Sequence, residues 1–269
     1  MVLSLYPRDA LHYHTESVNK YYKDISIPPS EGGLIPTLNS YGYMLENPDV
    51  ISHAFIQYAA KTKGLVLDIG SAYGVSVISA LQNGATVIAN DLDERHLQIL
   101  VKNTPYPLRK NLSIIKGKFP NQVDLQENSV NAVLASGVLH YLTGEELVLA
   151  IQKIFSILKS GGKFFFFTST PYIGIFQKYL ETYLSRKARG DLWPGLIRNS
   201  WVYAPHRKEQ LPKEINLLDK DIIFRLLTKC GFEIEQMEYV SMEGYPMDFQ
   251  SDGKEYIGVI AQKPIQLFF

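Results

Sequence analysis

The stretch VLDIGSAYGVSVISAL, residues 66–81, restricts the fold more than any other part of this chain. The continuous apolar run over 64–69 is typical of a strand that is buried on both faces. A turn of small residues follows, and then Val75, Ile78 and Leu81 recur at helical spacing. A strand, a tight turn and a helix in this order predict a βαβ unit whose turn binds a nucleotide.

The alternation of strand and helix continues to about residue 169. The predicted strands cover 64–69, 85–90, 112–117, 129–136 and 163–170, and the predicted helices cover 74–84, 92–103 and 143–162. Thr143 and Glu146 form a capping-box pattern, and Gly161-Gly162 is expected to end that last helix. A helix and a strand over 218–240 and a last strand at 255–263 follow. This order predicts a parallel sheet covered by helices on both faces.

Two segments interrupt the alternation and divide the chain into parts. Residues 1–45 are rich in Tyr, Pro and Gly, and we expect them to form an N-terminal lid or substrate segment. Residues 171–213 are expected to form a cap insertion. The main domain is then built from 46–170 and 214–269.

The turn after the first strand excludes two common nucleotide sites. A dinucleotide fingerprint would need glycine at 72 and 75, where the chain has Ala72 and Val75. A P-loop would need glycine at 75 with a lysine after it. Asp68 adds a physical objection, because a pyrophosphate at this helix N-terminus would meet a second anion in a partly dry cleft. The turn therefore favours a cationic ligand.

Composition limits the remaining classes of function. The formal net charge is zero, so no global field attracts nucleic acid or an anionic membrane. Cys230 is the single cysteine, which excludes an internal disulfide and a thiolate metal site, and we expect no metal. No long apolar segment follows a basic flank near the N-terminus, and no run is long enough to span a bilayer. We expect a cytoplasmic protein without stable membrane insertion, or one delivered by a route that reads no N-terminal signal.

The residues VLDIGSAYG resemble the first motif of the class I S-adenosylmethionine-dependent methyltransferases, in which a carboxylate lies two residues before a glycine-rich turn. The chain departs from the motif at Ala72, where the family often has glycine. Residues 131–166 resemble the family in their order of strand, loop, helix, Gly-Gly and strand. The resemblance implies a three-layer α/β/α Rossmann-like sandwich, with a seven-stranded, mostly parallel sheet and an antiparallel last strand. It also implies S-adenosylmethionine as cofactor.

The resemblance assigns a donor site along the carboxyl ends of the strands. Asp68 would act through water or the backbone on the methionine end, Asp91 would accept the ribose hydroxyls, and Leu92 would pack on the adenine. The complete set of expected cofactor-binding residues is Asp68, Gly70, Ser71, Ala72, Gly74, Asp91, Leu92, Lys118, Phe119, Ser136 and Gly137. Lys118 stands near the place of the family's adenine-binding aspartate, so backbone groups, Gln122 or Asp124 could read the base instead.

Several of these residues also have purely structural interpretations. Asp68 could cap the turn, and Asp91 could form an Asx turn. His140 follows the fourth strand and could be a general base or an orienting group, or could equally be a packed histidine. We expect His96, on the helix 92–103, to be solvated.

The acceptor site is expected where the two irregular segments cover the sheet. His140, Tyr21 and Tyr22 are the candidate catalytic residues on that side. Residues 171–213 hold both tryptophans, four tyrosines, eight Lys/Arg and three acids, so they carry a charge of +5 by count. This pattern favours a small organic acceptor, aromatic or anionic, although the aromatics could simply pack the cap and the charges could be solvated. The alternatives are a non-catalytic donor-binding partner protein and a methyltransferase of protein side chains.

Overall fold

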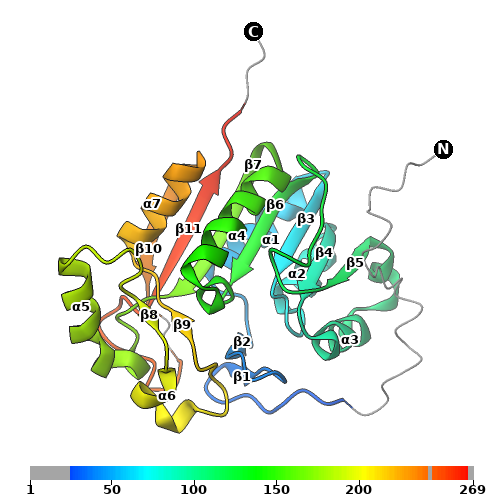
Figure 1. The fold of residues 1–269 in the computed structure, drawn as a ribbon. Coiled ribbons are helices and arrows are strands. Elements are labelled where there is room, and N and C mark those ends of the chain that lie inside the picture. Colours follow the sequence, from blue (N-terminus) through cyan, green and yellow to red (C-terminus); the bar gives the residue numbers. More distant parts are fainter. Residues whose placement is uncertain (1–24, 242–243, 266–269) are drawn as a thin grey trace.

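The computed structural model describes residues 25–241 and 244–265, and its core is a seven-stranded sheet (Figure 1). The strands lie in the order β10-β11-β7-β6-β3-β4-β5. Their bounds are Leu65–Ile69 (β3), Thr86–Asp91 (β4), Leu112–Lys116 (β5), Val130–Ser136 (β6), Leu158–Ser169 (β7), Glu233–Val240 (β10) and Tyr256–Gln262 (β11). β3 to β7 pair in parallel, whereas β11 is antiparallel to both of its neighbours. The predicted sheet with an antiparallel last strand is confirmed.

Helices cover both faces of the sheet, as predicted. α1 (Val50–Lys61), α2 (Val75–Gln82) and α3 (Glu94–Asn103) pack on one face, and α4 (Gly144–Ile157) and α7 (Lys220–Cys230) pack on the other (Figure 1). The run of four phenylalanines in β7 serves both layers, because alternate side chains of a strand point to opposite faces. Phe165 and Phe167 lie in the first core, and Phe164 and Phe166 lie in the second. The three-layer Rossmann-like sandwich is therefore confirmed.

The predicted start of α4 is confirmed, but its predicted end is wrong. The Thr143 capping box is present. The helix stops at Ile157, however, and Gly161 and Gly162 already belong to β7. Its last carbonyls are bound by groups from elsewhere: the N–H groups of Asn128 and Ser129 donate to the carbonyls of residues 156 and 157. These tertiary partners end the helix five residues before the predicted position.

α1 was not among the predicted helices, although it supports the site. Asp49 is its N-cap, and Asp49 Oδ1 accepts hydrogen bonds from the N–H groups of Ile51 and Ser52 at 2.8 and 2.9 Å. Such a cap satisfies helical N–H groups that have no partner in the first turn. The cap carboxylate is buried at the carboxyl ends of β3 and β6, where it also accepts from Ser136 Oγ.

Two small units cover the carboxyl ends of the parallel strands (Figure 1). The strap, residues 34–45, contains β1 (Leu34–Pro36) and β2 (Tyr43–Leu45), which pair in antiparallel register. The cap, residues 171–213, contains η4 (Gly174–Tyr179), α5 (Leu180–Ala188), β8 (Leu196–Ile197), α6 (Ser200–Tyr203) and η5 (Pro205–Arg207), and β8 pairs with β9 (Ile215–Asn216). Tyr21 and Tyr22 lie outside the described residues.

Candidate functional site

A cavity of about 380 Å³ lies between the turn after β3, the strap and the cap. Ligand sites of open α/β sheets lie at this edge, and this volume is within the usual range for small-molecule sites. The predicted donor residues that line the cavity are Asp68, Gly70, Ser71, Ala72, Asp91, Leu92, Lys118, Phe119, Ser136 and Gly137. His140 also lines it. Gly74 does not, so ten of the eleven predicted donor residues share one cavity with the predicted catalytic histidine.

The turn after β3 holds an unusual backbone conformation at Ala72, whose φ is +45°. Side chains other than glycine rarely adopt this left-handed region, which explains why the family often has glycine here. Gly74, the N-cap of α2, has φ +90°, and a Cβ there would lie 2.5 Å from Leu100 Cγ. Gly74 therefore lets α2 pack closely against α3, while the cavity is lined by the residues before it.

The surroundings of the Asp68 carboxylate show whether this site fits a cationic donor. Its side chain is buried, with 4 % of the residue exposed, yet none of the hydrogen bonds found among the described residues involves its carboxylate. Burial, followed by the charges of Asp91 and Asp49, raises the pKa of Asp68 well above its ordinary value. Ser71 Oγ is also buried without a partner in the described part of the chain. A carboxylate without a partner and a free hydroxyl suit a ligand with an ammonium group.

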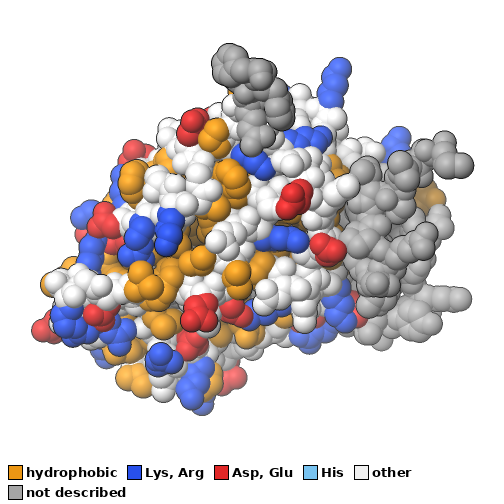
Figure 2. All heavy atoms as spheres, turned by 45° about the horizontal axis from the view of Figure 1, so that its top comes forward, with side chains coloured by type: hydrophobic (Ala, Val, Ile, Leu, Met, Phe, Trp, Pro, Cys, Tyr) orange, Lys and Arg blue, Asp and Glu red, His pale blue; other side chains and the backbone are white. Residues whose placement is uncertain are grey.

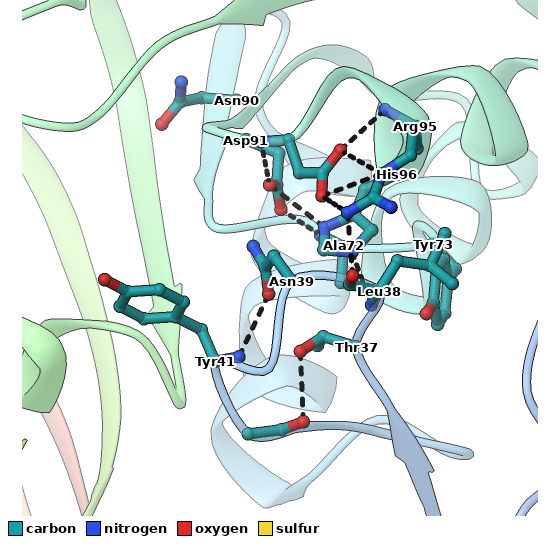
Figure 3. Close-up of polar contacts among 12 residues, drawn as sticks. Thr37, Leu38, Asn39, Tyr41, Ala72, Tyr73, Asn90, Asp91, Arg95 and His96 are labelled. Carbon is teal, nitrogen blue, oxygen red and sulfur yellow. Dashed lines mark hydrogen bonds and ion pairs between the residues drawn. The ribbon is translucent and has the colours of Figure 1, made fainter. Parts of the chain in front are cut away.

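Asp91, in contrast, is well supplied with partners (Figure 3). Asp91 Oδ1 accepts from the Asp93 N–H at 2.8 Å and lies 3.1 Å from His96 Nδ1, and Oδ2 accepts from the Ala72 N–H at 2.9 Å. A carboxylate has about four lone-pair positions, so one acceptor position remains, on Oδ2. The geometry offers that position to one ribose hydroxyl rather than to two.

The prediction that His96 is solvated is wrong, since its residue is only 1 % exposed. Its ring lies between Asp91 and the strap, and its Nε2 accepts a hydrogen bond from the Leu38 N–H at 3.0 Å. The Tyr73 ring packs on it edge to face, with centroids 5.1 Å apart. The strap therefore buries a face of α3 that the sequence pattern predicts to be exposed to solvent.

The contacts of Lys118 argue against a role in binding the adenine base. Its Nζ forms an ion pair with Glu146 at 2.5 Å, and its N–H donates to Gln122 Oε1 at 2.8 Å. The Gln122 carbonyl is thus already used within the chain. Buried Phe119 lines this part of the cavity, so apolar contact is the main interaction that the site offers here.

His140 lies fully inside the fold, on the cavity wall. Its Nδ1 is 3.0 Å from Thr168 Oγ1, and the centroids of its ring and of the Tyr141 ring are 4.1 Å apart. Burial lowers the pKa of His140 to about 3. A group this weakly basic stays neutral at physiological pH and is a poor general base, so orienting an acceptor suits it better than removing a proton.

We expect His140 to make the protein less stable in acid. Its folded pKa, about 3, lies below the ordinary value of 6.5, so between these values only the unfolded chain binds the proton. From pH 7.5 to 5.5 the wild type should lose about 1.4 kcal/mol more unfolding free energy than His140→Asn. Urea unfolding of both proteins at the two pH values measures this difference, and equal losses would mean that the histidine titrates normally.

The acceptor side of the cavity is aromatic and apolar, and both irregular segments contribute to it, the first through Tyr41 and Tyr43, but the two tryptophans of the cap do not. Neither Trp193 nor Trp201 lines it. Trp193 packs against Gly144 at the start of α4, and Trp201 Nε1 donates to the Leu211 carbonyl. The walls come from the strap, the sheet, the segment after β6, the cap, β9 and the segment before β11: Tyr41, Tyr43, Met44, Tyr141, Phe167, Ile173, Ile175, Phe176, Leu211, Ile215, Phe249 and Tyr256.

The positive charge of the cap is also directed elsewhere. None of its eight Lys/Arg lines the cavity. Three of them form ion pairs with aspartates instead. Arg207 binds Asp248 at 2.9 Å, Lys187 binds Asp219 and Asp221, and Arg189 binds Asp191. On the face shown in Figure 2, basic and acidic side chains are interspersed, with no continuous basic surface.

The strand order, and the place of the cavity at the carboxyl ends of the parallel strands, are those of the Rossmann-like methyltransferase fold. Residues 66–162 match the family model described as a methyltransferase domain, and this part of the chain is an S-adenosylmethionine-dependent methyltransferase domain. A comparison with curated protein sequences gives no match. Within the described residues, no helix combines the length and the apolar character needed to cross a membrane.

Solved structures agree with this fold at low sequence identity. An S-adenosylmethionine-dependent methyltransferase from Mesorhizobium loti is 16 % identical with a TM-score of 0.57, and 79 % of this chain covers 98 % of that one. A methyltransferase from Methanosarcina mazei is 17 % identical with a TM-score of 0.59, with 82 % and 100 % covered. The 1,6-didemethyltoxoflavin-N1-methyltransferase of Burkholderia thailandensis, solved with 1,6-didemethyltoxoflavin and S-adenosylhomocysteine, is 16 % identical with a TM-score of 0.56, with 79 % and 76 % covered.

Sequence reasoning missed several polar residues of the cavity, among them Asn39, Asp49 and Ser52. Asp49 carried a usable signal, because an aspartate directly before the apolar, helix-forming residues 50–61 is an N-cap pattern. Asn39 carried none, since it lies in a loop whose position depends on contacts with α3.

Proposed function

We propose that this chain transfers the methyl group of S-adenosylmethionine to a small, neutral and largely apolar acceptor. The observation that carries this proposal is the charge of the cavity wall. Its carboxylates are Asp49, Asp68 and Asp91, and its one lysine, Lys118, is paired with Glu146. An acceptor with a carboxylate or phosphate would meet like charge here, while the aromatic walls suit a flat organic molecule.

The proposed roles follow the geometry. S-adenosylmethionine supplies an activated methyl group on a sulfonium, which needs no acid to leave. Asp68 and Ser71 bind the methionine end, and the free lone pair of Asp91 Oδ2 binds a ribose hydroxyl. Strap and cap exclude water and hold the acceptor in line with the methyl group, which supplies much of the rate in such a displacement. His140 orients the acceptor.

The cavity also bears on the alternatives. An enzyme acting on protein side chains needs an open, shallow acceptor site, whereas the residues on this wall are mostly buried under the strap and cap. The Burkholderia thailandensis enzyme, solved with bound 1,6-didemethyltoxoflavin, supports the same proposal.

The first measurement is calorimetric titration with S-adenosylmethionine and S-adenosylhomocysteine, for which we expect micromolar binding, about −8 kcal/mol. Matched pairs of phenols and heteroaromatic compounds, each with and without a carboxylate, are then compared by formation of S-adenosylhomocysteine. We expect the neutral member of a productive pair to have a kcat/KM at least about tenfold higher. Faster turnover of the carboxylated members contradicts a neutral acceptor, and methylation of peptides alone would favour the protein side-chain enzyme. Donor binding without turnover of any acceptor would favour the non-catalytic alternative.

A further inference from the structure

The strap is attached to the donor side of the cavity by three hydrogen bonds within three residues. Tyr73 Oη donates to the Pro36 carbonyl at 2.8 Å, and Arg95 Nη2 donates to the Leu38 carbonyl at 2.7 Å. The Leu38 N–H donates to His96 Nε2 at 3.0 Å (Figure 3). On its other side the strap meets the cap, where the Gly42 N–H donates to the Gln210 carbonyl at 2.6 Å. The strap therefore connects the donor side with the acceptor side.

The protons of His96 follow from its partners. The Leu38 N–H is a donor, so Nε2 must be the acceptor and must carry no proton. The proton of the neutral ring is then on Nδ1, which donates to Asp91 Oδ1 at 3.1 Å. One imidazole thus joins the carboxylate assigned to the ribose and the backbone of the strap in a single buried chain of hydrogen bonds.

The strap also carries a polar side chain to the same place. Asn39 Oδ1 accepts from the Tyr41 N–H at 3.1 Å, which fixes the orientation of the amide. The Asn39 side chain points toward Asp91 in Figure 3, and both residues line the cavity. No hydrogen bond from Asn39 Nδ2 is found among the described residues, so this donor is free for a ligand oxygen. The free acceptor position on Asp91 Oδ2 is its complement, and a ribose hydroxyl can satisfy both groups.

We propose that the strap closes on the ribose of the donor, with Asn39 as a further binding residue and His96 as a positioning residue that links Asp91 to the strap. This inference rests on the proposed function, because it needs a donor with a ribose. Binding and closure are then thermodynamically linked: by whatever factor strap closure raises donor affinity, the donor raises strap closure. Because the strap also contacts the cap, donor binding orders the wall against which the acceptor is held.

A pair of substitutions separates the two contacts of His96. Asparagine places its amide nitrogen near the position of Nδ1, so His96→Asn keeps the contact with Asp91 and loses the strap. Glutamine places its carbonyl oxygen near the position of Nε2, so His96→Gln keeps the strap and loses Asp91. Hydrogen exchange of peptides that span residues 34–45, with and without S-adenosylhomocysteine, reports on the strap directly.

Without ligand, we expect the strap of His96→Asn to exchange about fivefold faster than in the wild type, and that of His96→Gln to exchange at a similar rate to the wild type. Saturating S-adenosylhomocysteine should slow strap exchange about tenfold in the wild type and less than about threefold in both variants. A matched variant, Asn39→Asp, keeps the acceptor for Tyr41 and loses the free donor. It should bind S-adenosylhomocysteine at least about tenfold more weakly.

The outcomes distinguish the two proposals. If the wild type binds S-adenosylhomocysteine and its strap exchange does not change, the strap proposal is overturned and the donor site stands. If the straps of the two His96 variants exchange at the same rate without ligand, His96 is only a packed residue. If the wild type does not bind, the proposed function fails, and the strap has no role in it. Should either His96 variant fail to fold, Tyr73→Phe, which removes only the bond to the Pro36 carbonyl, must speed strap exchange without ligand and reduce the protection by S-adenosylhomocysteine.

Discussion

Replacing Asp68 with asparagine should make the ligand-free protein more stable and the donor complex much weaker. In the folded chain Asp68 is buried without a hydrogen-bond partner among the described residues. At pH 7 the folded protein must either keep this poorly solvated charge or take up a proton, and each costs more free energy than burying a neutral amide. We expect the unfolding free energy to rise by about 1–3 kcal/mol.

The gain in stability should depend on pH in a defined direction. Burial raises the folded pKa of Asp68 above its ordinary value of 3.8, so the wild type loses stability as the pH rises above that value. The advantage of Asp68→Asn is therefore small near pH 4 and larger at pH 7. Urea unfolding of the two ligand-free proteins at both pH values measures it.

Donor affinity should move in the opposite direction. A donor with an ammonium group loses its charged partner in Asp68→Asn, which should cost at least about 2 kcal/mol, a decrease of about 30-fold in affinity for S-adenosylmethionine. Calorimetric titration of both proteins gives the ratio. Unchanged affinity, with the stability gain present, would mean that Asp68 does not face the donor.

A neighbouring aspartate provides the matched control. Asp49 is equally buried, but Asp49 Oδ2 accepts from Ser52 Oγ at 2.6 Å and from Ser136 Oγ at 2.7 Å. Asp49→Asn replaces this acceptor with a donor, so the same substitution should lower the unfolding free energy by about 1–2 kcal/mol. Opposite signs at two buried aspartates would show that the presence of partners, rather than burial, decides the effect.

The sheet and the donor turn could be predicted from the sequence because their signals are local. The apolar run at 64–69, the small residues of the turn and the helical spacing after it lie within about 20 residues, and each suffices for its own element. The acid at 91 follows from the same reasoning, since it ends the next strand of the sheet.

What could not be predicted depends on contacts between distant parts of the chain. His96 is adjacent to the apolar stripe of α3, and only the strap, 58 residues earlier, makes its position a buried one. The end of α4 is similar, because Lys263 Nζ donates to the carbonyls of residues 155 and 158 from more than 100 residues away. The composition of the cap was read correctly, but which of its side chains face the cavity depends on how α5 is anchored.

The contact that holds α5 centres on Asp219, and we expect its replacement by alanine to lower the stability of the protein. Asp219 is the N-cap of α7, where its Oδ1 accepts from the Ile222 N–H at 3.0 Å. Its Oδ2 accepts from the hydroxyl of buried Tyr183 and from Lys187 Nζ, both on α5 of the cap. Burial tends to raise the pKa of Asp219, but the hydrogen bonds from Lys187 and Tyr183 outweigh it and hold the pKa below its ordinary value.

Asp219→Ala removes the helix cap and takes away the carboxylate that accepts the hydrogen bond of the buried Tyr183 hydroxyl. The first change costs about 1 kcal/mol and the second about 1–3 kcal/mol, so we expect the unfolding free energy to fall by about 2–4 kcal/mol. Urea unfolding at neutral pH measures it. Asp219→Asn should lose less, because asparagine also caps helices and an amide oxygen still accepts from Tyr183.

Asp221 is the control that separates this anchor from an ordinary ion pair. Lys187 also binds Asp221, at 2.5 Å, but the Asp221 side chain is 73 % exposed whereas that of Asp219 is 1 % exposed. Exposed ion pairs contribute little, so Asp221→Ala should change the unfolding free energy by less than about 0.5 kcal/mol. An equal loss of unfolding free energy in the two alanine variants would mean that the ion pairs of Lys187 provide the stabilisation. The expected difference places it in the buried Tyr183–Asp219 contact, which holds α5 of the cap against α7.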